Sequence, residues 1–194
     1  MNERVWIAAV GGMLIGCTLA SCRMPWTIRP IAAGEEKGGA GRPFDPTAYV
    51  DSIWDTKVVR AAANAPDFAQ AKSIGRATLV KGTGRVLRID TARGEALLDI
   101  APYDGKPDAA LATGPIRGTA LRDALPFIQF SQFLNQVDFA HAANALDDRA
   151  TSAAAGSVKG LTAGAVLSFA GALDPAGDPP EIVPVTLTRE PSRP

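Results

Sequence analysis

The order of hydrophobic and polar positions divides the 194-residue chain into an apolar leader, a polar stretch and a region with regular periodicity. Residues 5–19 are almost all apolar, and the polar stretch follows. From residue 46 onward, apolar positions recur every three or four residues, which predicts a helix over residues 46–63. Asp45 is a suitable N-cap, Pro46 suits the first helical position, and Pro66 prevents the helix from continuing.

Strand-like alternation replaces the helical spacing from Leu79 onward. Residues 85–90 and 96–100 alternate on either side of a turn at 91–94, which predicts a hairpin. We expect a third strand over residues 110–112 and 116–121, interrupted by Gly114-Pro115. Phenylalanines at helical spacing then predict a helix from Phe127 to about Leu146, and two more strands are expected over 166–171 and 182–188.

Three strands, a helix and two strands follow one another in the order found in a small five-stranded barrel of the OB type. We therefore predict a mainly β domain of the α+β class, an OB-like barrel preceded by an amphipathic helix. The glycines at positions such as 82, 84 and 171 suit the bends of a small barrel. An open antiparallel sheet with two helices on one face is the alternative.

The leader resembles the processing site of a bacterial lipoprotein. Arg4 precedes the apolar run, and Leu19-Ala20-Ser21 leads into Cys22. The run is shorter than the ~20 apolar residues of a membrane span. We expect residues 1–21 to be a signal peptide and Cys22 to be lipidated with acyl chains such as palmitate, which anchors the protein to a membrane outside the cytoplasm. Cys17 is a weaker candidate, because its use would shorten the apolar run further. Arg23 after Cys22 favours the outer over the inner membrane.

The polar stretch at residues 22–43 is rich in glycine, alanine and charge, so we expect a flexible tether. A single lipoprotein domain is expected over 44–190, followed by a disordered tail at 191–194. The 20 basic and 20 acidic residues balance, and no Lys/Arg run favours nucleic acid as a partner. Removal of Cys17 with the signal peptide leaves Cys22 without another cysteine, so no disulfide is expected.

Three stretches resemble the family of predicted periplasmic lipoproteins called domain of unknown function 2291. They are residues 44–58, residues 81–86 and residues 114–130, the last with the core Gly-Thr-Ala-Leu-Arg-Asp-Ala-Leu-Pro-Phe-Ile, continuing into Phe133, Asn135 and Gln136. The resemblance implies a lipoprotein without assigned chemistry. Because members are often encoded beside sugar-uptake ABC transporters, it also implies an accessory or binding component, with an ABC transporter or a periplasmic binding protein as partner. Between Ala63 and Leu79 this chain is shorter than the family's helical segment.

Residues suited to catalysis are scarce. His141 is the single histidine, and we expect it to be half-buried on its helix. The sequence has no Gly-x-Ser-x-Gly motif, and one histidine without a cysteine pair cannot form a zinc site. Asp99 and the turn 104–108 lack the spacing of a calcium loop. We expect a protein that is not an enzyme and that uses no metal or cofactor.

Arg122 and Asp123 stand in an otherwise apolar segment, where charges have to be compensated. In one interpretation, Arg122 pairs with a carboxylate or with carbonyl groups and stabilises a corner of the fold. In the other, Arg122 and Asp123 belong to a small-ligand pocket with Arg117, Asn135 and Gln136, and the protein is a free-standing binding lipoprotein. Phe127, Phe130 and Phe133 are expected in the core rather than as a stacking platform.

Overall fold

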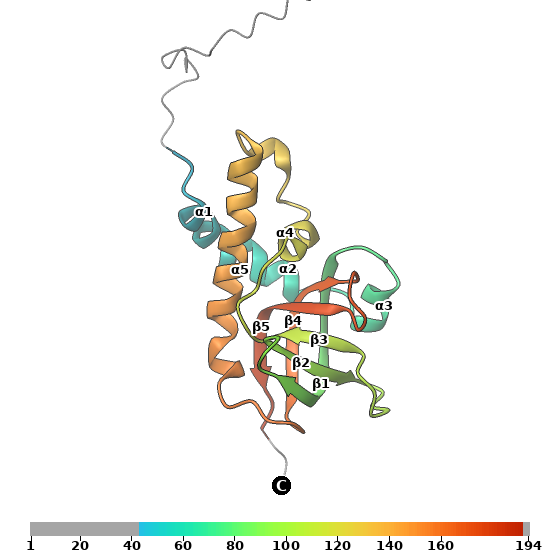
Figure 1. The fold of residues 1–194 in the computed structure, drawn as a ribbon. Helices are drawn as coiled ribbons and strands as arrows, with labels where there is room; N and C mark the ends of the chain where they lie inside the picture. The colour runs from blue at the N-terminus through green and yellow to red at the C-terminus, as the bar shows by residue number, and fades with distance from the viewer. Residues whose placement is uncertain (1–42, 192–194) are drawn as a thin grey trace, which may run out of the picture. The chain divides into compact units, whose positions relative to one another are not determined.

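Five strands close into a barrel in the order β1-β2-β3-β5-β4 in the computed structural model, which describes residues 43–191 (Figure 1). Neighbouring strands are antiparallel except β3 and β5, which are parallel. The strands are β1 (Thr78–Asp90), β2 (Glu95–Ile100), β3 (Ala109–Ala112), β4 (Val166–Asp174) and β5 (Glu181–Arg189). The predicted signal peptide, Cys22 and tether to residue 42 lie outside the described residues, as do residues 192–194.

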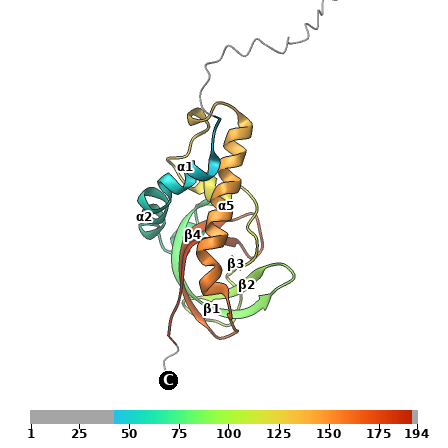
Figure 2. The same cartoon turned by 90° about the vertical axis from the view of Figure 1, so that its left-hand side faces the viewer.

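Helices pack on one side of the barrel and around its end. They are α1 (Pro46–Ile53), the π-helix η1 (Trp54–Val58), α2 (Val59–Ala63), α3 (Phe68–Lys72), α4 (Ala120–Ala124), the 3-10 helix η2 (Phe130–Gln132) and α5 (Gln136–Val158). The long helix α5 runs along the barrel and contacts β5 (Figure 2). Because α5 lies between the third and fourth strands, the topology is that of the predicted OB-type barrel, and the open-sheet alternative is wrong.

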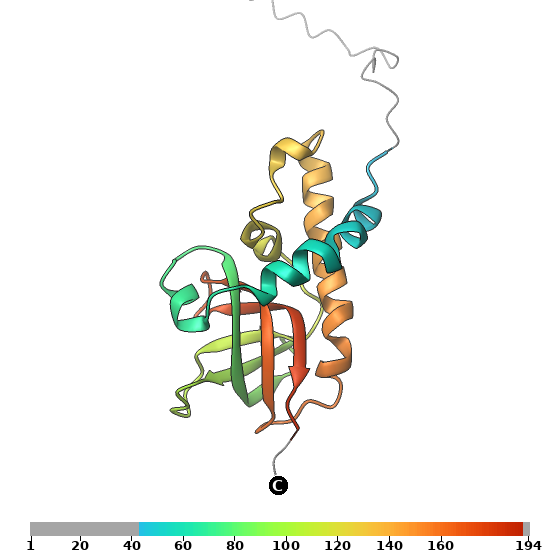
Figure 3. The same cartoon turned by 180° about the vertical axis from the view of Figure 1, so that it is seen from behind.

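The predicted first helix is present, with a π-helical turn in its middle. Val50, Trp54, Val58 and Ala62 are all buried, and they are spaced by four residues. In a regular α-helix of 3.6 residues per turn, that spacing would drift away from one face. The wider π turn at η1 reduces the drift, so the buried stripe continues along α1, η1 and α2. Together these three elements form one helical rod, which crosses α5 (Figure 3).

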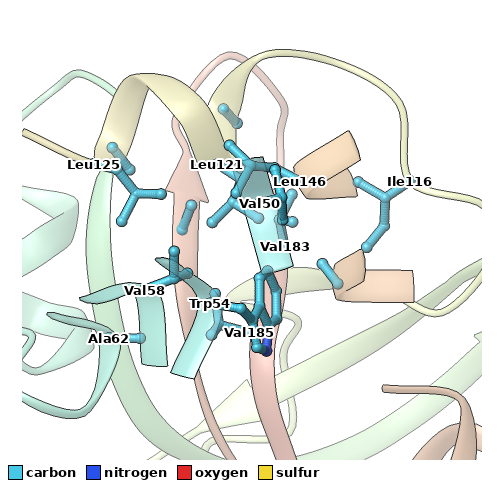
Figure 4. Close-up of a cluster of buried hydrophobic side chains, with 14 of the residues drawn as sticks. Val50, Trp54, Val58, Ala62, Ile116, Leu121, Leu125, Leu146, Val183 and Val185 are labelled. Atoms are coloured by element: carbon cyan, nitrogen blue, oxygen red, sulfur yellow. The ribbon is translucent and has the colours of Figure 1, made fainter. Parts of the chain in front are cut away.

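Two hydrophobic cores share the barrel wall. The first fills the barrel, where Leu98, Leu111 and Leu167 are fully buried. The second lies outside the barrel, where the α1–α2 rod, α4 and α5 cover β4 and β5 (Figure 4). Trp54 and Val185 both belong to this outer core and are buried.

A β-bulge changes which side of β5 faces the barrel interior. The register shifts between Ala170 and Gly171 of β4, so Val185 is the extra residue on β5. Before the bulge Ile182 points into the barrel core, and beyond it Leu187 does so. A simple alternation over residues 182–188 would have put Val183, Val185 and Leu187 on one face.

Two predicted elements differ from the structure. The third strand ends at Ala112, and residues 116–121 form a loop and the start of α4 instead of a continued strand. Ile116 is buried against the helices, so its apolar character reflects the outer core. The predicted helix at 127–146 is also displaced: α5 begins at Gln136, because Asn135 caps it, and it continues to Val158. Its second half is rich in alanine, the best helix former, which gives little apolar periodicity.

Candidate functional site

The corner between α4 and α5 is held by Arg122. Its Nε and Nη2 donate to Oδ1 of Asp123 at 2.9 Å and 2.7 Å, and its guanidinium lies 4.0 Å from the ring centre of Phe139 on α5. The Arg122 side chain is 13% exposed, whereas Asp123 is nearly half exposed. These are contacts that the structural interpretation of Arg122 predicts, and its contribution to stability stays a prediction.

Among the described residues, no hydrogen bond joins Arg122 to Arg117, Asn135 or Gln136. Arg117 is exposed, and its Nη1 lies 3.4 Å from Oδ1 of Asp148 on α5. Asn135 accepts the backbone N–H of Asp138 as the N-cap of α5, and the exposed Gln136 is the first residue of that helix. Arg122 and Asp123 thus remain a pair, while Asn135 and Gln136 belong to the start of α5.

Sequence reasoning missed a buried carboxylate in this corner. Asp147 of α5 is 2% exposed, and its Oδ2 has no hydrogen-bond partner in the described structure. The backbone of Gly118 lies beside the carboxyl and favours the charged form. Burial, and to a smaller extent the charge of Asp148, raises the pKa of Asp147 to about 6, although Gly118, Arg117 and Arg122 act in the opposite direction. The helical spacing of Ala143, Asp147 and Ala150 is the signal that could have found it.

A groove between α1 and α5 has a cavity volume of about 460 Å³. Its lining residues come from both helices: Pro46, Thr47, Val50, Asp51, His141, Asn144, Ala145, Asp148, Arg149 and Ser152. His141 is exposed there, so its predicted half-burial is wrong. The groove combines two carboxylates, an imidazole, an amide, hydroxyl groups and a guanidinium within one concave surface.

Arg149 lines the groove from α5 and is held by contacts with α1 and η1. Its guanidinium lies 5.3 Å from the Trp54 ring centre, and its Nε lies 3.6 Å from Oδ1 of Asp51. That Nε is buried and has no hydrogen-bond partner in the described structure. A buried donor without a partner lowers the stability of the protein. The Arg149 side chain as a whole is 39% exposed, so the groove gives a ligand access to part of the guanidinium.

Neither Arg122 nor Asn135 lines this groove, and neither lines either of two smaller cavities on the barrel. One of these, of about 380 Å³, lies over β1, β4 and β5, and the other, of about 300 Å³, lies by Gly94, Gly114 and Leu161. The geometry therefore places the candidate binding site between α1 and α5. Asp148 lines this groove and also forms an ion pair with Arg117.

The aspartates in and next to the turn after β2 stabilise that turn. The buried Asp99 accepts backbone N–H groups of Asp104 and Gly105 at 3.2 Å and 2.9 Å, and Asp108 accepts the N–H of Ile100 at 2.8 Å. These carboxylates close the loop. Within residues 43–191, no three His, Cys, Asp or Glu side chains are grouped as metal ligands would be, and no helix is long and apolar enough to cross a membrane.

Barrel topology and comparison with solved structures both define this protein as an OB-fold protein. A crystal structure at 1.90 Å of an OB-fold protein from Thermotoga maritima superposes with a TM-score of 0.61 at 16% identity, covering 76% of this chain and 99% of that one. The sequence model described as predicted periplasmic lipoprotein (DUF2291) matches residues 67–188. The chain belongs to this family, which makes it a periplasmic lipoprotein associated with a membrane. No curated protein matches the chain.

Proposed function

We propose that this lipoprotein acts by binding rather than by catalysis, and that its groove between α1 and α5 takes a small, hydroxyl-rich solute such as a sugar. The observation that carries the proposal is the set of polar groups in the groove: Asp51, Asn144, Asp148 and Arg149 offer acceptors and donors on one concave surface. Sugar hydroxyl groups both donate and accept hydrogen bonds, so they complement such a mixed set.

The orientation of Arg149 supports the same proposal. Its guanidinium is held over Trp54 and beside Asp51, so a ligand would meet a donor that is already positioned. Preorganised donors lose less conformational entropy when a ligand binds. A pocket at Arg122 has no comparable support, because that guanidinium is engaged by Asp123 and Phe139.

We also propose that the protein serves as an accessory component of a sugar-type ABC uptake system. The family resemblance supports this link, and the chemistry of the groove is compatible with it. The partner would be the transporter or its periplasmic binding protein. Arg23 after Cys22 supports anchoring in the outer membrane, which separation of the two membranes by density would test.

Thermal melting of the mature protein with a panel of mono- and disaccharides tests the binding proposal. We expect one class of sugar to raise the melting temperature of the wild type and of Gln70→Leu, an exposed control on α3 outside the groove. Asn144→Leu should keep the melting temperature of the free protein but lose the increase, because it removes an amide from the groove. If no sugar raises the wild-type melting temperature, or if Asn144→Leu responds like the wild type, the proposal is wrong.

A further inference from the structure

An uncharged segment forms the end of the domain from which α5 starts. Residues 124–137 contain no Asp, Glu, Lys or Arg, and they include three of the most exposed large apolar side chains of the described residues. Leu134 is 91% exposed, Val137 is 60% exposed and Phe130 is 49% exposed. We call these three residues the apolar tip. Phe130 was predicted in the core, and this prediction is wrong because Phe130 lies in the short 3-10 helix η2 and not in the continuous α-helix that was expected.

The segment that carries the apolar tip is held by packing. Phe130 and Phe133 contact Phe139 of α5, with ring centres 5.6 Å and 5.2 Å apart. Gln129 and Gln132 form a reciprocal capping box around η2. The exposed side chains therefore project from an ordered scaffold, and their exposure in water is unfavourable.

The tip lies at the end of the domain where the chain arrives from the lipid anchor. Phe44, two residues into the described chain, packs against Phe133 with ring centres 5.4 Å apart. From Cys22 to Phe44 there are 44 − 22 = 22 residue steps, which span at most roughly 75 Å when fully extended. Anchoring at Cys22 would therefore keep Phe44 within about 75 Å of the bilayer, and Phe44 contacts the segment that carries the tip.

We propose that the apolar tip inserts into the head-group region of the bilayer in which the lipoprotein is anchored. Residues 124–137 carry no charged side chain of their own, so inserting Phe130 and Leu134 transfers mainly apolar surface. Asp138, which follows Val137 and is hydrogen-bonded to Asn135, has to stay at the aqueous edge of the head-group region. The exposed asparagine, glutamine and serine side chains of the segment suit the polar side of this region. The proposal rests on the family's membrane anchoring and not on sugar binding. In this orientation α5 points away from the membrane, and the opposite end of the barrel lies farthest from it (Figure 1).

The test uses the mature, acylated protein in phospholipid vesicles that carry a doxyl quencher near the head groups. An environment-sensitive dye is attached through Leu134→Cys in one sample and through Ala163→Cys in the other. Ala163 is an exposed residue beyond the far end of α5, a helix of 23 residues that spans roughly 33 Å. Cys22 is acylated and does not react with the dye.

We expect a blue shift and strong lipid-borne quenching at position 134, and little of either at position 163. A dye at Val137→Cys should lose most of its quenching when Leu134→Ser is added, with an unchanged melting temperature. Absence of quenching at 134, or equal quenching at 134 and 163, would overturn the proposal. A blue shift at 134 without lipid-borne quenching would also overturn it, since that result indicates a second copy or another protein on the tip.

Discussion

Replacing Asp147 by asparagine should make the protein more stable at neutral pH, although it removes a charge that lies near two arginines. The Asp147 carboxyl is 2% exposed, and its Oδ2 has no hydrogen-bond partner within the described residues. Asparagine has nearly the same shape, and its side-chain oxygen can still face the backbone of Gly118. The substitution therefore removes the buried negative charge with little change in packing.

The magnitude follows from the pKa of Asp147, which rises from 3.8 to about 6 because the folded protein buries the carboxyl. Between these values the folded state keeps a proton that the unfolded state has released, so the free energy of unfolding falls as pH rises through this interval. The difference corresponds to about 3 kcal/mol, reached near pH 7. Asp147→Asn has no carboxyl to titrate, so its free energy of unfolding relative to that of the wild type should rise by about 3 kcal/mol between pH 4 and pH 7.

Urea unfolding at several pH values between 4 and 8 measures this difference directly. Asp148→Asn is the matched control, because Asp148 is a neighbouring but exposed carboxylate. The stability of the control relative to the wild type should change little over the same range. If the difference in free energy of unfolding between Asp147→Asn and the wild type does not depend on pH, the pKa of Asp147 is not raised by burial and the reasoning fails.

Three further predictions concern the corner, the bulge and the anchor. Arg122→Ala should lower the free energy of unfolding by about 1–3 kcal/mol, because it loses the Asp123 pair and the stacking on Phe139. Arg122→Lys should recover only part of this free energy. An Arg122→Ala variant whose urea unfolding matches that of the wild type would rule out a structural role. Gly171→Ala should destabilise the protein by at least about 1–3 kcal/mol, because the added Cβ would lie 2.9 Å from Cα of Pro184 and against the Val183 carbonyl. Thermal melting tests this, with Gly156→Ala as the control, because Gly156 is an exposed helical residue with open space around the position of a Cβ. Cys22→Ala should abolish acylation and release the protein from the membrane fraction, and a variant that stays in that fraction with its lipid label would refute the assignment of the anchor.

Local patterns in the sequence were sufficient to predict the succession of strands and helices along the chain and to assign the chain to the lipoprotein family. The hairpin and the last two strands alternate over a few residues, and the first helix carries its own cap at Asp45. Such signals depend on neighbours along the chain, so they can be interpreted without a tertiary structure. The family resemblance likewise rested on continuous stretches of sequence.

Only the tertiary structure decided which polar groups are buried and which apolar groups are exposed. Asp147 and Asp148 are adjacent and chemically identical, yet only Asp147 faces the corner covered by Gly118. Leu134 and Phe130 are apolar, yet they project from the end of the domain because α5 begins at Gln136. Burial depends on which distant segment packs against a side chain, and the chemistry of that side chain alone does not specify its partner. The groove between α1 and α5 has the same origin, since three of the five barrel strands separate its two walls in sequence.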